Sequence, residues 1–406
     1  MSSPLNNKRI LFLTAHPPFP PSSGDKIATL NTIKGLLKQG AIIDLLTLCD
    51  ASDIKNLAGL EKFINGRLFT VKMPNKIFRI IIATLCGRSL VHSRFYSSEY
   101  LCRFKMMAND YEIIIANHSY MAQYISKAGP VVNALKLHDI HVLESNVMLM
   151  RSSFATNPLM KALFMSESRR LLSEENKYFQ SFDRNYSYGD YETDLLKNTL
   201  GKVVKYRPIG ISTDAFESSD GNEKTLIFFG DYKWFPNYNG IQYVLEKVFP
   251  KLRDRISDAK LIVAGRNADK KILALCSQAG VTFVGEVTDI NKLLSECSYV
   301  LAPILIGGGV RLKVIESLAA GKIVISNTQS AEGILDKKVL IVDDDLDALI
   351  GKIENIMSDR ESFIRMKRAA IDYVLKNHSI DAATSYLLDD IRTLVAEKNL
   401  QILNNG

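Results

Sequence analysis

The sequence has little that would support a disulfide framework or a metal centre. Only five of its 406 residues are cysteines, an odd number, and they form neither a Cys-x-x-Cys pair nor a Cys/His cluster. Disulfide-dependent secreted domains are much richer in cysteine, and zinc sites place their ligands at short, fixed spacings. We therefore expect reduced thiols, a cytoplasmic protein and no metal site.

Long hydrophobic runs and long basic runs are also missing. No apolar stretch approaches the ~20 residues that a helix needs to cross a bilayer. The apolar run at residues 10–13 is short, lacks a cleavage pattern behind it, and is typical of a strand rather than a signal peptide. Basic residues do not form runs of five or more and are not interleaved with an aromatic-rich sheet motif, so we expect no nucleic-acid partner.

What the sequence does contain is typical of a globular protein with an anionic ligand. It is 47% hydrophobic and 23% charged, and 406 residues are enough for two or three domains. The net charge of +7 suits an anionic substrate or an anionic membrane surface.

Strand and helix patterns alternate along both halves of the chain. In the first half, a strand over Arg9–Ala15, a helix over Lys26–Lys38 and a strand over Ile42–Leu48 are predicted. In the second half, the strands Thr225–Phe229 and Lys260–Ala264 repeat the pattern. This alternation favours an α/β fold built from two Rossmann-like, doubly wound parallel sheets.

The stretch from Val300 to Asn327 is the most informative. An apolar strand, Val300–Ile306, leads into three glycines, then a helical pattern, a glycine at position 321 and a second strand, Ile323–Ser326. The unpaired amides and the dipole of such a helix start favour an anion, and glycines let a ligand approach the backbone closely. The unit therefore predicts a crevice that binds a negatively charged group.

Two cations, Arg311 and Lys313, stand at this helix start, and Glu316 follows one turn later. Cations oppose the helix dipole there, which favours an anionic ligand between them. A tight turn with two solvated cations and a surface glutamate explains the spacing equally well. Because Leu312 takes the place of the third fingerprint glycine and no Walker loop is present, the stretch indicates a diphosphate or phosphosugar outside those two motif classes.

The run GGGVRLKVIESLAAGK at residues 307–322 resembles the donor-binding segment of glycosyltransferase family 4. That family consists of retaining enzymes with the GT-B fold, in which two Rossmann-like domains face a central cleft. The resemblance is strongest over Thr225–Gly333 and weak in the first half. It departs from the usual family motif at Gly308, where a second glutamate contacts the donor sugar, and is similar to a bacterial polysaccharide subgroup with a Gly-Gly-Gly-x-Arg-x-Lys loop.

The resemblance implies a domain layout and an activity. Residues 1–206, joined by a C-terminal helix over 382–406, would form the acceptor-binding domain, and residues 207–381 the donor-binding domain. The activity implied is metal-independent, retaining transfer of a sugar from a nucleotide-sugar to a glycan or lipid-linked acceptor in cell-surface polysaccharide or lipopolysaccharide synthesis, without a cofactor.

The resemblance also implies roles for particular residues. Arg311 and Lys313 would neutralise the diphosphate, Glu316 would bind the ribose, and His118 would approach the donor sugar or the acceptor. Histidines at successive strand ends point toward the crevice independently of any family, although a single histidine is more often structural. The remaining ligand-binding candidates are Gly24, His138, Gly230, Lys233, Glu286, Val287, Gly308, Gly309, Val310 and Leu312.

Residues 72–105 carry seven basic residues against one acidic residue, with apolar residues interleaved. A basic helix with an apolar side can lie on an anionic membrane, but an ordinary amphipathic helix packed on the domain has the same pattern. The family resemblance favours the membrane and a peripheral location at the inner face.

Two other functions are compatible with the residues. The first is a sugar-nucleotide epimerase or hydrolase of the same fold. The second is a nucleotide-sugar-binding scaffold protein without activity, which the glycine at position 308 keeps open.

Overall fold

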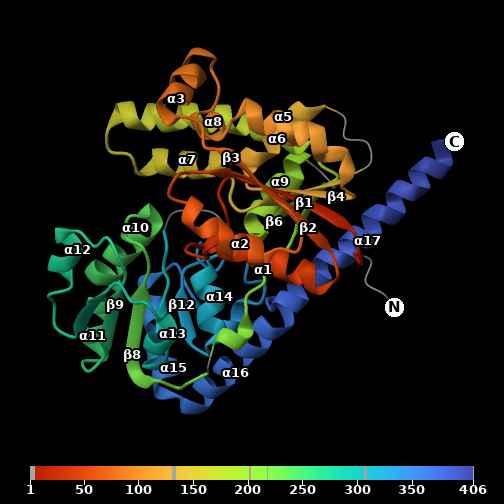
Figure 1. Cartoon of the computed structure of the whole chain (residues 1–406). Coiled ribbons are helices and arrows are strands. Elements are labelled where there is room, and N and C mark those ends of the chain that lie inside the picture. Colours follow the sequence, from red (N-terminus) through yellow and green to blue (C-terminus); the bar gives the residue numbers. More distant parts are fainter. Residues whose placement is uncertain (1–4, 130–133, 201–202, 217, 306–308, 406) are drawn as a thin grey trace. The chain divides into compact units, whose positions relative to one another are not determined.

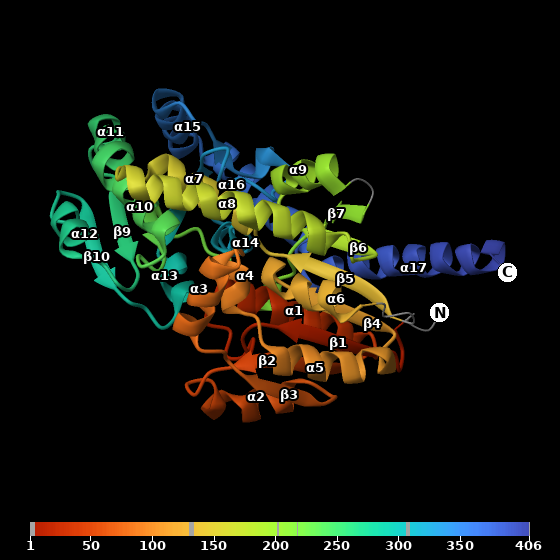
Figure 2. The ribbon, with the colours of Figure 1, turned by 90° about the horizontal axis from the view of Figure 1, so that it is seen from above.

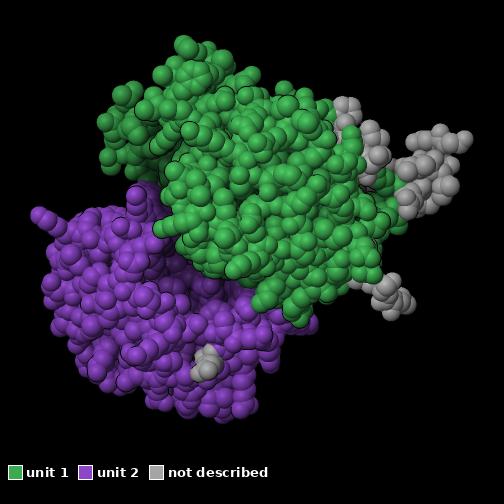
Figure 3. Space-filling model, viewed as in Figure 1, with its two compact units in different colours: residues 1–210, 380–406 green, residues 211–379 purple. Residues whose placement is uncertain are grey.

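A computed structural model describes residues 5–129, 134–200, 203–216, 218–305 and 309–405. The chain divides into two compact units, unit 1 with residues 1–210 and 380–406 and unit 2 with residues 211–379 (Figure 3). Each unit holds one parallel sheet with helices packed on it (Figure 1). The predicted fold class, two Rossmann-like doubly wound domains of the GT-B type, is confirmed.

Unit 1 contains a seven-stranded sheet in the order β3-β2-β1-β4-β5-β6-β7, with every pair parallel. The strands are β1 Arg9–Thr14, β2 Ile42–Cys49, β3 Leu68–Lys72, β4 Ile113–Asn117, β5 Leu135–Ile140, β6 Arg184–Ser187 and β7 Val204–Tyr206. The helices are α1 Gly24–Lys38, α2 Leu57–Phe63, α3 Lys76–Leu85, α4 Leu90–Arg94, α5 Ser98–Met107, α6 Ala122–Ala128, α7 Glu144–Phe154, α8 Pro158–Phe179, α9 Asp190–Leu200 and α17 Ile380–Asn405.

Both faces of this sheet are covered, which explains why its strands are apolar throughout. Along β1, Ile10 and Phe12 belong to the core shared with α1, α2 and α17. The alternate residues Leu11 and Leu13 belong to the core shared with α5, α6 and α8. The helices α7 and α8 lie side by side in both ribbon views (Figures 1 and 2).

Unit 2 contains a six-stranded parallel sheet in the order β10-β9-β8-β11-β12-β13. The strands are β8 Asn222–Phe229, β9 Lys260–Ala264, β10 Val281–Gly285, β11 Cys297–Leu301, β12 Ile323–Ser326 and β13 Ile341–Val342. The helices are α10 Phe235–Tyr243, α11 Phe249–Arg255, α12 Lys270–Leu275, α13 Ile290–Ser295, α14 Leu312–Ala319, α15 Leu346–Ser358 and α16 Arg360–Asn377, with a π-helical segment at Val244–Val248.

The units divide a few residues away from the expected boundaries at 206/207 and 381/382. The carbonyl of Gly210 accepts a hydrogen bond from Asn31 Nδ2 of α1 at 2.9 Å, so residues 207–210 stay with unit 1. The amide of Ile211 donates to His378 O at 2.7 Å, which ties residue 211 to the end of unit 2.

Two expected elements differ from the structure. The strand predicted at Val300–Ile306 is β11, which starts at Cys297 and ends at Leu301, because Pro303 cannot donate to the ladder. The basic stretch at 72–105 contains three helices, α3, α4 and α5, rather than one.

Candidate functional site

Both sheets reverse their strand order at one place, between β1 and β4 in unit 1 and between β8 and β11 in unit 2. In open parallel sheets, ligands bind outside the carboxyl ends of the strands at such a switch point. In unit 2 these ends carry Gly230, which follows β8, and the glycine loop that leads from β11 to α14. In unit 1 they carry the loop from His16 to α1 and, after β4, His118.

The N-terminus of α14 is a positively charged helix start. Arg311 is the N-cap residue, its side chain does not cap the helix, and no acidic residue lies in the first turn. Both Arg311 and Lys313 are half-buried. The free amides, the helix dipole and the two cations therefore add at one point, where an anion would be stabilised.

The side chain of Lys313 is fixed at the end of β8. Its Nζ donates to Phe229 O at 2.8 Å and to Asn237 Oδ1 at 2.9 Å. It also lies 4.6 Å from the centre of the Phe228 ring. Burial, followed by repulsion from Arg311, lowers the pKa of Lys313 to about 7. An anion bound nearby would favour the charged form and raise that pKa.

Asn237 is a site residue that the sequence reasoning missed. It is nearly buried, at 9% exposure, and its Nδ2 donates to Asp231 O at 3.1 Å while its Oδ1 accepts from Lys313. A Cβ at position 230 would lie 2.7 Å from Asn237 Nδ2, which explains the glycine there. The Pro236-Asn237 pair at the start of α10 was the available signal, but its partner is 76 residues away in sequence.

Glu316 lies one turn beyond Lys313 on α14 and is half-buried. Burial raises the pKa of Glu316 to about 7, and the nearby Lys313 opposes that rise. A carboxyl group in this position is able to bind a polar ligand group beside the anion site, and the role expected of Glu316 stays a prediction.

The buried carboxylate of Glu332 holds the backbone of Gly309. Gly309 has a φ of +77°, which favours glycine, and its amide donates to Glu332 Oε2 at 3.1 Å. Glu332 is 4% exposed and was not among the predicted site residues. Of the other predicted loop residues, Val310 and Leu312 are half-buried, and Gly308 lies outside the described residues.

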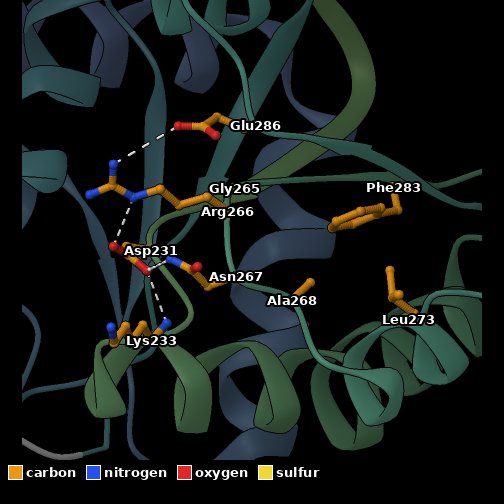
Figure 4. A pocket seen from close by; sticks show the side chains of 9 residues that line it. All are labelled: Asp231, Lys233, Gly265, Arg266, Asn267, Ala268, Leu273, Phe283 and Glu286. Carbon is orange, nitrogen blue, oxygen red and sulfur yellow. Dashed lines mark hydrogen bonds and ion pairs between the residues drawn. The ribbon is translucent and has the colours of Figure 1, made fainter.

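A hollow of about 620 Å³ opens in unit 2 beside the end of β8 (Figure 4). Asp231 organises its wall by accepting from Arg266 Nε at 2.8 Å and from Asn267 Nδ2 at 2.7 Å. Two predicted site residues, Lys233 and Glu286, line this hollow, and Val287 follows Glu286 in the same loop. Sites for small ligands have volumes in this range.

In unit 1, His118 lies in a cluster of polar side chains at the switch point. Its φ of +76° is unusual for a residue with a side chain, and its ring stacks on His141 with ring centres 4.1 Å apart. Its Nε2 lies 3.5 Å from Asp25 Oδ2, in the first turn of α1 directly after Gly24. Burial acts to raise the pKa of Asp25, but hydrogen bonding and attraction to His118 outweigh it and hold that pKa well below its usual range.

The expectation that His138 faces a ligand is wrong. His138 was expected at the end of a strand, whereas β5 continues to Ile140, so His138 lies inside the sheet with no exposed surface. Its ring nitrogens contact Asn185 Oδ1 at 2.9 Å and His118 O at 3.2 Å. Burial lowers the pKa of His138 to about 4, so the ring is neutral and supports the backbone of His118.

In the part of the chain that the structure describes, no three His, Cys, Asp or Glu side chains gather in a way that could hold a metal ion. Within the same residues, no helix is both long enough and apolar enough to cross a membrane.

Residues 223–359, which make up most of unit 2, match a family model described as glycosyl transferases group 1. No curated protein sequence is significantly similar to the chain.

Several solved structures share the fold at low sequence identity. Anabaena Alr3699/HepE in complex with UDP-glucose is 12% identical, with a TM-score of 0.65, covering 95% of this chain and 100% of that one. Sucrose-phosphate synthase from Thermosynechococcus elongatus is 16% identical, with a TM-score of 0.69, over 96% and 100% of the two chains. WaaG, a glycosyltransferase involved in lipopolysaccharide biosynthesis, is 13% identical, with a TM-score of 0.61, over 94% and 99%.

Proposed function

We propose that the protein is a glycosyltransferase that moves a sugar from a nucleotide-sugar to a glycan or lipid-linked acceptor. The observation that carries this proposal is the pair Arg311 and Lys313 at the N-terminus of α14, with Lys313 anchored on the end of β8. This pair lies in the range that matches the group 1 family model. Unit 2 is then the donor-binding domain and unit 1 the acceptor-binding domain.

The chemistry of this site is electrostatic. As the glycosidic bond of the donor breaks, negative charge grows on the leaving diphosphate, and Arg311, Lys313 and the first amides of α14 stabilise it. One well-placed donor of this kind is worth about 3 kcal/mol of barrier. Glu316 binds the ribose and so fixes the donor relative to the cations.

The finer points of the proposal are retention of configuration and independence from metal ions. Two protein cations at the diphosphate take the place that a divalent ion has in metal-dependent transferases. We propose that the acceptor attacks from the face that the diphosphate leaves, which is one route to the retention that the resemblance to glycosyltransferase family 4 implies. His118, whose ring is oriented by Asp25 and His141, is the proposed contact of unit 1 with a reacting group.

Structures with this fold suggest the substrate classes. Alr3699/HepE was solved with UDP and with UDP-glucose, and a TarM variant from S. aureus with UDP and a glycoside of N-acetylglucosamine. We therefore propose a uridine diphosphate sugar as the first donor to test, and a cell-surface polysaccharide or lipopolysaccharide as the acceptor. We further propose a cytoplasmic protein that contacts the membrane through residues 72–105.

Product analysis with a panel of nucleotide-sugars and lipid-linked glycan acceptors tests the proposal. The expected result is acceptor-dependent release of a nucleoside diphosphate together with a glycosylated acceptor, and a rate at least a hundredfold lower in Lys313→Ala. Lys292→Ala, which removes an exposed lysine of α13, is the matched control and should keep its rate.

The same experiment separates the two alternative functions. An epimerase converts the donor without an acceptor, and a scaffold protein binds the donor without converting it. Normal turnover in Lys313→Ala would remove the proposed role of this side chain.

A further inference from the structure

The helix α3 presents its apolar side chains to solvent instead of to the core of unit 1. Ile77, Phe78, Ile81 and Leu85 are 71%, 60%, 52% and 81% exposed, whereas Ala83 is buried. The helix lies on the outside of unit 1 (Figure 1). Exposed apolar side chains gathered on one element indicate an interaction surface rather than ordinary packing.

A small cationic pocket adjoins this face. Arg79 and Ile82 of α3, Arg88 of the following loop and Lys127 of α6 line it, together with Tyr96 and Tyr178. Its volume of about 40 Å³ is room for a few water molecules. Residues 78 and 81 belong to the apolar face of α3, and the residues that follow them, 79 and 82, line the pocket. The helical repeat therefore places the pocket and the apolar face on neighbouring sides of α3.

Two of the three cations in this pocket, Arg79 and Lys127, lie over aromatic rings. Lys127 Nζ lies 4.2 Å from the centre of the Tyr96 ring, and Arg79 Cζ lies 5.1 Å from the same centre. Lys127 Nζ also donates to Gln123 Oε1 at 2.8 Å. Within the described residues, none of Arg79, Arg88 and Lys127 forms an ion pair.

The one carboxylate in the pocket wall is already engaged. Glu174 Oε2 lies 2.7 Å from His92 Nδ1, and Glu174 Oε1 accepts from Ser89 N at 3.2 Å. Three cations therefore face one committed carboxylate. Burial, followed by repulsion from Arg88, lowers the pKa of Lys127 to about 8, which is the strain that a bound anion would relieve.

We propose that this pocket binds the phosphate of an anionic phospholipid headgroup while the apolar face of α3 enters the acyl region of the same bilayer. Arginine pairs with phosphate through parallel hydrogen bonds, and a basic helix with an apolar face is attracted to anionic lipid on both counts. A phospholipid unites a phosphate and an apolar chain in one molecule, which matches the adjacency of the pocket and the face. The inference rests on the membrane contact within the proposed function, but it does not depend on sugar transfer.

Sedimentation of the full chain with vesicles, in the absence of any nucleotide-sugar, tests this. Vesicles of phosphatidylcholine with phosphatidylglycerol should bind the protein, and vesicles of phosphatidylcholine alone should not. The double variant Arg79→Gln/Arg88→Gln should weaken binding by about tenfold or more, since each cation near an anionic surface contributes severalfold. The single variant Arg88→Gln changes an exposed side chain and should weaken binding by about fivefold.

Lys62→Ala is the matched control, because Lys62 is an exposed cation of α2, outside both the pocket wall and residues 72–105. It should change vesicle binding less than twofold. An equal loss in Lys62→Ala would show general charge attraction and overturn the pocket. Absence of binding to the anionic vesicles, or full competition by millimolar glycerol phosphate, would overturn the lipid assignment. Stabilisation by nucleoside diphosphates is measured in the same variants and should not change. Failure of the lipid-binding proposal can therefore be distinguished from failure of the proposed function.

Discussion

At the scale of single residues, Lys313 should control the pH dependence of the proposed donor site. Its pKa of about 7 means that the free protein loses this cation as the pH rises through neutrality. Affinity for a nucleoside diphosphate should therefore fall by about tenfold between pH 7 and pH 8.5. Calorimetric titration across that range measures the fall.

Two variants separate Lys313 from its neighbour in that titration. Lys313→Arg keeps the positive charge at every accessible pH and should flatten the profile. Glu316→Gln removes the other group that titrates near pH 7 and should leave the fall in place. A fall that persists in Lys313→Arg would assign the pH dependence to another group.

Asn237 should act through Lys313. Asn237→Ala removes an acceptor of the ammonium group and should lower turnover by about tenfold, whereas Asn239→Ala, on the same helix with an exposed side-chain bond to Phe235 O, should not. Asn237→Asp places a carboxylate beside Nζ, raises the pKa of Lys313 and should move the pH fall upward. An unchanged pH profile in Asn237→Asp would leave Asn237 with a structural role only.

The candidate site residues that the sequence predicted differ from those that it missed in how far apart their partners lie in sequence. Arg311, Lys313 and Glu316 were found because one helix sets their mutual spacing. Asn237 and Glu332 were missed because their partners, Lys313 and Gly309, are distant in sequence and are brought close only by the sheet. For His138, the pattern did not show where β5 ends, and three residues decide whether a side chain is buried or faces a ligand.

At the scale of elements, the turn after β9 depends on one glycine. Gly265 has a φ of +145°, and a Cβ there would lie 1.9 Å from Gly230 O, a backbone atom that cannot move away alone. Gly265→Ala should lower the free energy of unfolding of unit 2 by about 3 kcal/mol, from overpacking added to conformational strain.

Gly285→Ala is the matched control for that turn. Gly285 also has a positive φ, of +70°, but a Cβ there would meet only Phe283 Cε1, at 3.9 Å. Gly285→Ala should lower the free energy of unfolding only through conformational strain of the backbone, by about 1 kcal/mol. Thermal unfolding of both variants measures the difference, and equal losses would contradict the close approach of the two turns.

The hydrophobic pattern predicted β9 well, a strand that lies between two neighbouring strands of its sheet. The predicted strand Lys260–Ala264 agrees residue for residue with β9. Hydrophobic pattern did not reveal that the apolar residues of α3 face solvent, because exposure is set by what packs on an element rather than by its own sequence. The two alternatives left open for residues 72–105 differ only in that respect.

At the scale of the whole molecule, the last helix completes unit 1. α17 contributes Leu387, Leu388, Ile391 and Leu394 to the core of that unit. Its Asp390 is buried, pairs with Arg184 Nε at 2.9 Å and accepts from the hydroxyl of Tyr186 at 2.9 Å. Residues 380–406, which follow the whole of unit 2 (residues 211–379) in sequence, are therefore part of the fold of unit 1.

Asp390→Ala should destabilise unit 1 by about 3–5 kcal/mol, because it removes the buried carboxylate that pairs with the Arg184 cation and accepts from Tyr186. Asp389→Ala, one residue earlier, removes an exposed pair with Arg392 and should change stability by less than about 0.5 kcal/mol. Calorimetry should show that unit 1 of Asp390→Ala unfolds at a lower temperature than in the unchanged protein, while a nucleoside diphosphate still stabilises unit 2. Equal stability of the two variants would mean that α17 does not complete the core.

The measurement that tests the central claim most directly is thermal stability in the presence of UDP, GDP, dTDP and CMP. A ligand bound to the native state at one hundred times its Kd adds about 2.7 kcal/mol of stability. We predict selective stabilisation by one nucleoside diphosphate, lost in Arg311→Ala and in Lys313→Ala and retained in Lys292→Ala. Absence of a shift with every nucleotide, or a shift that survives both losses of charge at α14, would contradict the account.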